Sequence, residues 1–211
     1  MSQLLPSDLA QAESWLHRSI KQCLSDSTIK TMSVNLKFEG LRIMPVVIRL
    51  HKALNDHDNQ PYLVWSDPGA SSLAKRDNKE QSNVIFTYKE LLQEDLVIDE
   101  NKLLICVSPQ PYDYELFESL CDKHSGIIIV FNGKLEDGAV GIGSVGRERR
   151  KGLLSSLYTV FHLEPLSGGA LIKCYPEDWE LFKSYNDGFR YLTSSPHRPT
   201  PDEISEALSI V

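Results

Sequence analysis

Two adjoining segments contain the sequence patterns that most clearly suggest a binding site. Residues 141–146 read GIGSVG, which matches G-x-G-x-x-G, the spacing of loops that bind the phosphates of a dinucleotide. The next five residues read RERRK, so that one acid, Glu148, stands among four cations. The first segment could cradle a phosphate, and the second could bind an acidic partner. The four cations are Arg147, Arg149, Arg150 and Lys151.

The glycine motif lacks the context that a dinucleotide loop requires. In such a loop a strand leads directly into the glycines, so that the pyrophosphate reaches the helix N-terminus. Here the apolar run GIIIVFN ends at Asn132, and the charged stretch GKLEDG follows before Gly141. We therefore interpret the glycines as a loop leading into a helix over about 147–157, and we predict no cofactor.

The basic run has two interpretations. On a helix, Arg147, Arg150 and Lys151 share one face. The whole chain carries 22 Lys and Arg against 29 Asp and Glu, a net charge of −7, so this local positive charge is unusual. It is either a solvated helix face near acidic neighbours or a binding site, because arginine forks suit carboxylates and phosphates. We keep Arg147, Arg149, Arg150 and Lys151 as candidate partner- or anion-binding residues.

A second candidate site lies where predicted strands end. The segment DPGASSLAKRD, residues 67–77, follows a strand and opens a helix whose free N–H groups could hold an anion. The alternative is a compact strand-to-helix turn. Strands ending at Asp67, Pro109 and Asn132 would share one edge of a parallel sheet, where open α/β folds bind ligands. The candidate pocket residues are Asp67, Ser71, Ser72 and Asn132.

Other chemistry has no motif to support it. The chain has no H-E-x-x-H, no paired C-x-x-C and no G-x-S-x-G, so we predict no metal site and no catalytic residue. Cys23, Cys106, Cys121 and Cys174 are unpaired in spacing, which favours reduced, mostly buried thiols of a cytosolic protein. In the segment YPEDW, Trp179 is interpreted as part of a structural corner, although an exposed Trp179 would indicate a partner surface.

Composition restricts the class of protein. The chain is 41% hydrophobic and 24% charged, typical of a globular protein, and we expect a single domain over 1–211. Its acidity argues against nucleic acid as a partner. No apolar run approaches the roughly 18–20 residues that span a bilayer, and the N-terminus resembles neither a secretory signal nor a transit peptide. We expect a cytoplasmic protein with no integral membrane segment.

The pattern of apolar residues predicts an α/β fold. Residues 31–39 alternate apolar and polar side chains, as in a strand with one wet face. Dense apolar runs at 62–67, 83–87, 102–108 and 126–132 suit parallel strands buried on both faces. Helices are expected at 7–24, 45–55, 70–76, 114–124 and 201–208. Strands at 157–166, 169–176 and around 189–192 complete a single three-layer domain, whose mostly parallel, Rossmann-like sheet has an antiparallel C-terminal extension.

The order of these segments resembles a known family. DPGASSLAKRD, LLICVSPQPYDYELFESL, IIIVFNGKLEDG and the long stretch from Arg147 to Trp179 follow one another as in a domain-of-unknown-function family of cyanobacteria and chloroplasts. Its plant relatives include a factor named for low photosystem II accumulation and the accessory domain of a chloroplast adenylate kinase. The resemblance covers about residues 5–208, and it brings no established catalytic residue.

The resemblance implies a protein of a photosynthetic organism that assembles or maintains the photosynthetic apparatus. Its partner would be a protein, such as a photosystem or thylakoid component, and peripheral association with the thylakoid membrane is open. Our leading hypothesis is therefore a non-enzymatic binding or assembly factor that docks its partner in part through the basic run. The alternative is a ligand-binding or enzymatic α/β domain that holds a phosphorylated small molecule at the sheet edge.

Overall fold

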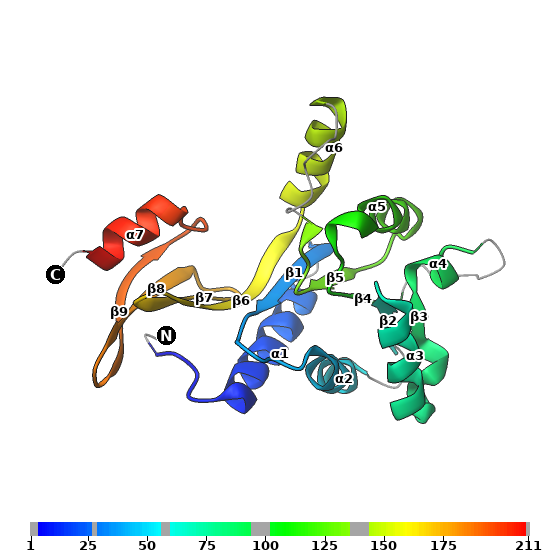
Figure 1. Ribbon diagram of the computed structural model, residues 1–211, viewed down its shortest axis with the longest axis horizontal. Coiled ribbons are helices and arrows are strands. Elements are labelled where there is room, and N and C mark those ends of the chain that lie inside the picture. Colours follow the sequence, from blue (N-terminus) through cyan, green and yellow to red (C-terminus); the bar gives the residue numbers. More distant parts are fainter. Residues whose placement is uncertain (1–3, 27–28, 56–59, 94–101, 136–143, 210–211) are drawn as a thin grey trace. The chain divides into compact units, whose positions relative to one another are not determined.

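The structure is a computed structural model that describes residues 4–26, 29–55, 60–93, 102–135 and 144–209. The first glycines of the opening motif, 141–143, lie outside these residues. The described strands follow the hydrogen-bonded order β3-β2-β4-β5-β1-β6-β7-β8-β9 (Figure 1). The mixed α/β fold, parallel first and antiparallel at its C-terminal end, confirms the predicted fold class.

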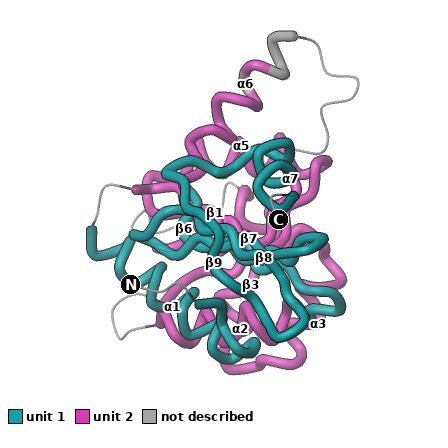
Figure 2. The backbone as a smooth tube through the Cα atoms, turned by 90° about the vertical axis from the view of Figure 1, so that its left-hand side faces the viewer, with its two compact units in different colours: residues 1–26, 34–41, 159–211 teal, residues 27–33, 42–158 magenta. Residues whose placement is uncertain are grey.

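The chain divides into two compact units, coloured separately in Figure 2. Unit 1 comprises residues 1–26, 34–41 and 159–211, and unit 2 comprises residues 27–33 and 42–158. Strand β1 (Thr31–Leu36) is divided between them after Ser33. Its burial alternates along its length, as its apolar–polar alternation predicted.

Unit 2 contains the parallel strands. These are β2 (Tyr62–Trp65), β3 (Ile85–Thr87), β4 (Leu104–Val107) and β5 (Ile128–Phe131). Every residue of β4 and β5 is buried, which explains their unbroken apolar sequences. Alternate side chains such as Val64, Cys106 and Val130 belong to one core cluster.

Helices flank this parallel sheet. Helix α5 (Tyr114–Lys123) contributes Phe117 and Leu120 to the cluster around Cys106, and Leu153 and Leu154 of α6 (Ser144–Ser155) pack against it. Figure 1 shows α2 (Ile43–Leu54) and α3 (Pro68–Asp77) on the side of these strands away from α5. Short helical segments join the strands: η1 (Lys79–Val84), α4 (Tyr88–Leu91) and η2 (Pro111–Asp113).

Unit 1 is built on an antiparallel meander. Its strands are β6 (Tyr158–Leu166), β7 (Gly169–Cys174), β8 (Trp179–Tyr185) and β9 (Gly188–Ser195). Helix α1 (Leu9–Ser25) begins at the N-cap Asp8, whose carboxylate accepts from the Gln11 N–H, and it contacts β7. Helix α7 (Pro201–Ser209) places Ile204, Ala207 and Leu208 against Leu171 and Leu181.

Several details differ from the sequence-based expectations. The strand predicted at 83–87 covers only Ile85–Thr87, because Lys79–Val84 forms η1, and the short helix α4 was not predicted. Helix α6 begins at Ser144, three residues earlier than predicted, so that Gly146 lies within the helix. Strand β8 was not predicted. Its register with β9 shifts between Leu181 and Phe182, and both residues are buried, so the alternation that marks a strand in the sequence is interrupted there.

Candidate functional site

The carboxyl ends of β2, β4 and β5 lie in register at one edge of the unit 2 sheet. Trp65 pairs with Val107, and Val107 pairs with Phe131, so the residues that follow them line up as well. Ser108 and Asn132 both adopt left-handed backbone conformations, with φ of 47° and 49°. The chain therefore turns sharply as it leaves β4 and β5, at the edge where the sequence placed a ligand pocket.

Asp67 occupies the position that was proposed for an anion. It is the N-cap of α3, and its carboxylate accepts hydrogen bonds from the Gly69 N–H at 3.2 Å and the Ala70 N–H at 2.8 Å. The Ser71 hydroxyl is buried and without a hydrogen-bond partner, whereas Ser72 is exposed. Since the chain's own carboxylate fills the helix N-terminus, this segment fits the compact turn that was the alternative interpretation.

Asp113 is a residue of this edge that the sequence analysis did not single out. It is buried, and its carboxylate accepts from the Ser66 hydroxyl and from the Gln110 N–H, the latter at 2.7 Å. The Gln110 side chain in turn donates to the Ser108 carbonyl at 2.8 Å. Asp113 thereby ties the end of β2 to the turn after β4. A signal was present in Gln110-Pro111 followed by an acid, which is typical of a capped helix start.

Arg150 is the residue of the basic run that the structure places most firmly. Its side chain is only 6% exposed, and its guanidinium lies 4.2 Å from the centre of the Tyr114 ring. One guanidinium nitrogen, Nη2, donates to the Pro111 carbonyl at 3.2 Å. Arg150 thus fastens α6 to the turn after β4 through a cation–π contact and a hydrogen bond.

Of the other three cations of the basic run, the structure describes only the side chain of Lys151. Lys151 is exposed, while the side chains of Arg147 and Arg149 lie outside what the structure describes. Beside the Arg150 anchor, Tyr112 is 79% exposed, more than any other large hydrophobic side chain among the described residues. The structure therefore joins two features that were separate in the sequence, the basic run and the turn after β4.

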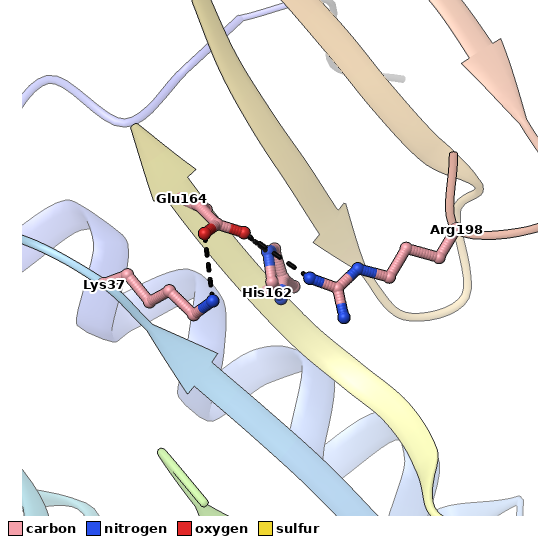
Figure 3. Close-up of polar contacts among 4 residues, drawn as sticks. All are labelled: Lys37, His162, Glu164 and Arg198. Carbon is pink, nitrogen blue, oxygen red and sulfur yellow. Dashed lines mark hydrogen bonds and ion pairs between the residues drawn. The ribbon is translucent and has the colours of Figure 1, made fainter. Parts of the chain in front are cut away.

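Unit 1 holds a charge cluster that sequence reasoning missed. Glu164 on β6 lies between Lys37, His162 and Arg198 (Figure 3). Its carboxylate is 2.9 Å from Lys37 Nζ, 2.9 Å from His162 Nε2 and 3.6 Å from Arg198 Nη2. Lys37 is brought there by a backbone hydrogen bond from its N–H to the Leu163 carbonyl at 2.8 Å. His162 and Glu164 are neighbours on one face of β6, and that spacing was the only sequence signal.

The cluster combines an ionised carboxylate with a neutral histidine. The hydrogen bond from His162, aided by Lys37, lowers the pKa of Glu164 to about 2, so this carboxylate is ionised at neutral pH. Burial lowers the pKa of His162 and keeps it neutral. Because a carboxylate only accepts, His162 Nε2 carries the proton, and its Nδ1 is buried without a partner. A bound molecule could not reach Nδ1 to exchange a proton.

Trp179 also belongs to the interior of unit 1. It is 5% exposed, and its ring centre lies 5.0 Å from that of His162. The exposed tryptophan that would have indicated a partner surface is not observed, and the structural interpretation of this segment applies.

The described residues contain neither a metal-ligand cluster nor a membrane-spanning helix. No group of three or more His, Cys, Asp or Glu side chains among them could hold a metal ion. Within the same residues, none of the helices combines the length and the apolar character needed to cross a bilayer.

Comparison with known proteins identifies one family. The sequence model described as "Domain of unknown function (DUF1995)" matches residues 6–206, nearly the whole chain. No curated protein and no solved structure matches the chain. The resemblance to the two plant proteins therefore stays an expectation.

Proposed function

The chain belongs to the DUF1995 family, a domain whose function is unknown, and we propose that it is a non-enzymatic binding domain that docks an acidic protein partner. The docking surface consists of α6 and the segment Pro111–Tyr114 of unit 2, and we call it the α6 surface. The finer part of the proposal is a role in assembling or maintaining the photosynthetic apparatus, with a photosystem or thylakoid component as partner and peripheral association with that membrane. That part rests on the family resemblance alone.

One observation supports the α6 surface above all. Arg150 is buried against Tyr114 and bonded to Pro111, which fixes α6 beside the turn that carries the highly exposed Tyr112. Lys151 next to this anchor is exposed. Aromatic side chains are enriched where protein interfaces bind most tightly, and a tyrosine has only two side-chain torsions to order when a partner covers it.

Two of the buried histidines, His51 and His162, are poorly placed for acid–base catalysis. Burial lowers the pKa of both His51 and His162, which are almost fully covered. His51 Nε2 is engaged with the Pro61 carbonyl at 2.9 Å. A general acid or base must reach the substrate, and burial keeps these two side chains from doing so.

The test is site-specific photo-crosslinking on the full chain. A photoreactive phenylalanine at Tyr112 should yield a discrete crosslinked product in a photosynthetic cell lysate at low salt. The matched control carries the same group at Phe189, which is 51% exposed on β9 of unit 1, and it should not give that product. Lys151→Glu should abolish the product at position 112, because charge reversal repels an acidic partner.

Lys123→Glu is the charge control for Lys151→Glu. Lys123 is exposed at the far end of α5 from Tyr114, roughly 13 Å along the helix axis at about 1.5 Å per residue. It should leave the crosslink at position 112 intact. Equal products at positions 112 and 189, or equal losses from the two charge reversals, would refute the α6 surface.

The alternative, a phosphorylated small molecule at the carboxyl edge, has less support. The Asp67 carboxylate already binds the N–H groups of α3, so a phosphate would have to displace an anion from the same donors. A thermal-shift screen with nucleotides and sugar phosphates tests this function, because a ligand that binds the native state must raise the melting temperature. A clear shift that Asp67→Asn enhances would favour it over protein docking.

A further inference from the structure

Helix α7 covers its part of the unit 1 sheet incompletely. None of its residues is buried, although Ile204 and Leu208 face the buried Leu171. Beside these contacts lies an open groove of about 1020 Å³. Its apolar lining comes from the strands on one side, with Leu166 and Leu171, and from α7 on the other, with Ile204 and Leu208.

The groove carries positive charge at the end where Glu164 and Arg198 line it. Glu164 is ionised, His162 is neutral, and both Lys37 and Arg198 contact the same carboxylate. One carboxylate between two basic side chains leaves one positive charge in excess. The Lys37 and Arg198 side chains are 48% and 49% exposed, so this excess faces solvent in a chain whose net charge is −7.

Arg198 is held in position without being neutralised completely. Its guanidinium lies 3.6 Å from the Glu164 carboxylate, longer than a normal hydrogen bond, and 5.8 Å from the centre of the Trp179 ring. An arginine in this state keeps donors for a second anion, and its planar fork suits a carboxylate or phosphate.

We propose that this groove binds an amphipathic anion, with an alkyl chain along Leu166, Leu171, Ile204 and Leu208 and a carboxylate or phosphate head group at Arg198. The size of the groove lies near the upper end of the roughly 300–1,000 Å³ of small-molecule sites, which are mostly apolar with a few placed polar groups. The site lies within unit 1 and does not depend on the α6 surface, so it stands or falls separately from the proposed function.

The chemical class is tested by titration calorimetry with C12 ligands below their micelle concentrations. Laurate and dodecyl phosphate present the same chain with the two anionic heads, and whichever binds tighter identifies the head group. Dodecanol should bind more weakly, and dodecylamine should not bind, because Arg198 and Lys183, which line the groove, repel a cation. No measurable binding of either anion, or equal binding of the amine, would overturn the proposal.

The place of binding is tested with a matched pair of arginines. Arg198→Gln should weaken binding of the preferred anion about tenfold or more, the loss expected for one charge-assisted hydrogen bond, and leave dodecanol binding unchanged. Arg190→Gln should have no effect. Arg190 also pairs with an acid, Asp187, and stacks on a tyrosine, Tyr185, but it does not line the groove.

Two outcomes would count against this site. Equal weakening by Arg190→Gln and Arg198→Gln would indicate adsorption to the surface in general and overturn it. A peptide with an acidic C-terminus that bound here while both C12 anions failed would assign the groove to protein and also overturn it. If Arg198→Gln fails to fold, as circular dichroism would show, the head-group series on the unchanged chain still decides.

Discussion

At the scale of single residues, the environment decides what a charged side chain can do. Arg150 and Arg198 are both arginines over aromatic rings, but Arg150 is buried and acts as an anchor, whereas Arg198 is half exposed beside a groove. His162 is likewise defined by its surroundings, since burial keeps it neutral beside an ionised carboxylate. Because His162 is neutral, the free energy of unfolding should depend on pH in a measurable way.

Neutral His162 should make the protein sensitive to mild acid. Its folded pKa lies below its unfolded value, so the unfolded chain takes up a proton first as the pH falls, and the free energy of unfolding decreases. Glu164 contributes only weakly between pH 7.5 and about 5.5, because its pKa moves from 4.5 to about 2 on folding and the unfolded carboxyl is still almost fully ionised there. Urea denaturation should therefore show a steeper loss of stability over this range for the wild type than for His162→Gln. Parallel pH profiles would show that His162 protonates equally in both states.

At the scale of elements, close contacts between backbones fix how strands and helices meet. Gly169 begins β7, and a Cβ there would collide with the Phe182 carbonyl of β8 and come within 2.9 Å of Leu208 on α7. Gly152 lies within α6, where a Cβ would meet nothing within 4 Å. The same residue type thus has opposite roles in two elements.

Alanine at these two glycines should change stability in opposite directions. Gly169→Ala should lower the free energy of unfolding by about 1–3 kcal/mol, since β8 and α7 must shift to admit a methyl group. Gly152→Ala should raise it by about 0.5–1 kcal/mol through helix propensity. Midpoints of urea denaturation would measure both, and a stabilising Gly169→Ala would show that the strand contact is looser than its geometry indicates.

Sequence patterns predicted most elements, and their failures have physical causes. Strand β8 was missed because the shift at Leu181 and Phe182 breaks its alternation. The Glu164 cluster could not be predicted, because Lys37 reaches Glu164 only through strand pairing, 127 residues away in sequence. The burial of Arg150 did have a signal. It lies three and four residues before Leu153 and Leu154, on the stripe of α6 that packs against the core.

At the scale of the whole molecule, neither unit is a continuous piece of chain. Residues 27–33 and 42–158 form one unit, and three separate segments form the other. Each unit holds two of the four cysteines, all of them free thiols: Cys23 and Cys174 in unit 1, Cys106 and Cys121 in unit 2. The thiols can therefore report on each unit separately.

The four thiols should react slowly in the native protein and together on unfolding. Burial raises the pKa of all four, to about 12 for Cys121 and Cys174, so little reactive thiolate exists at pH 8. Because β1 is divided between the units, we expect a single transition in urea at which all four are alkylated by iodoacetamide. Mass spectrometry of the labelled peptides would follow each thiol. Different midpoints for the two pairs would show that the units unfold independently.

Because unit 1 is formed from separate segments of the chain, the ribosome synthesises its parts at different times. Helix α1 contacts β7, yet β7 leaves the ribosome roughly 140 residues later, a delay of roughly 7–30 s at about 5–20 residues per second. During that interval α1, whose Leu16, Ile20 and Cys23 are buried in the finished protein, lacks its contact with β7. The contact between the amphipathic helix α1 and the sheet of unit 1 therefore forms only after β7 has been translated.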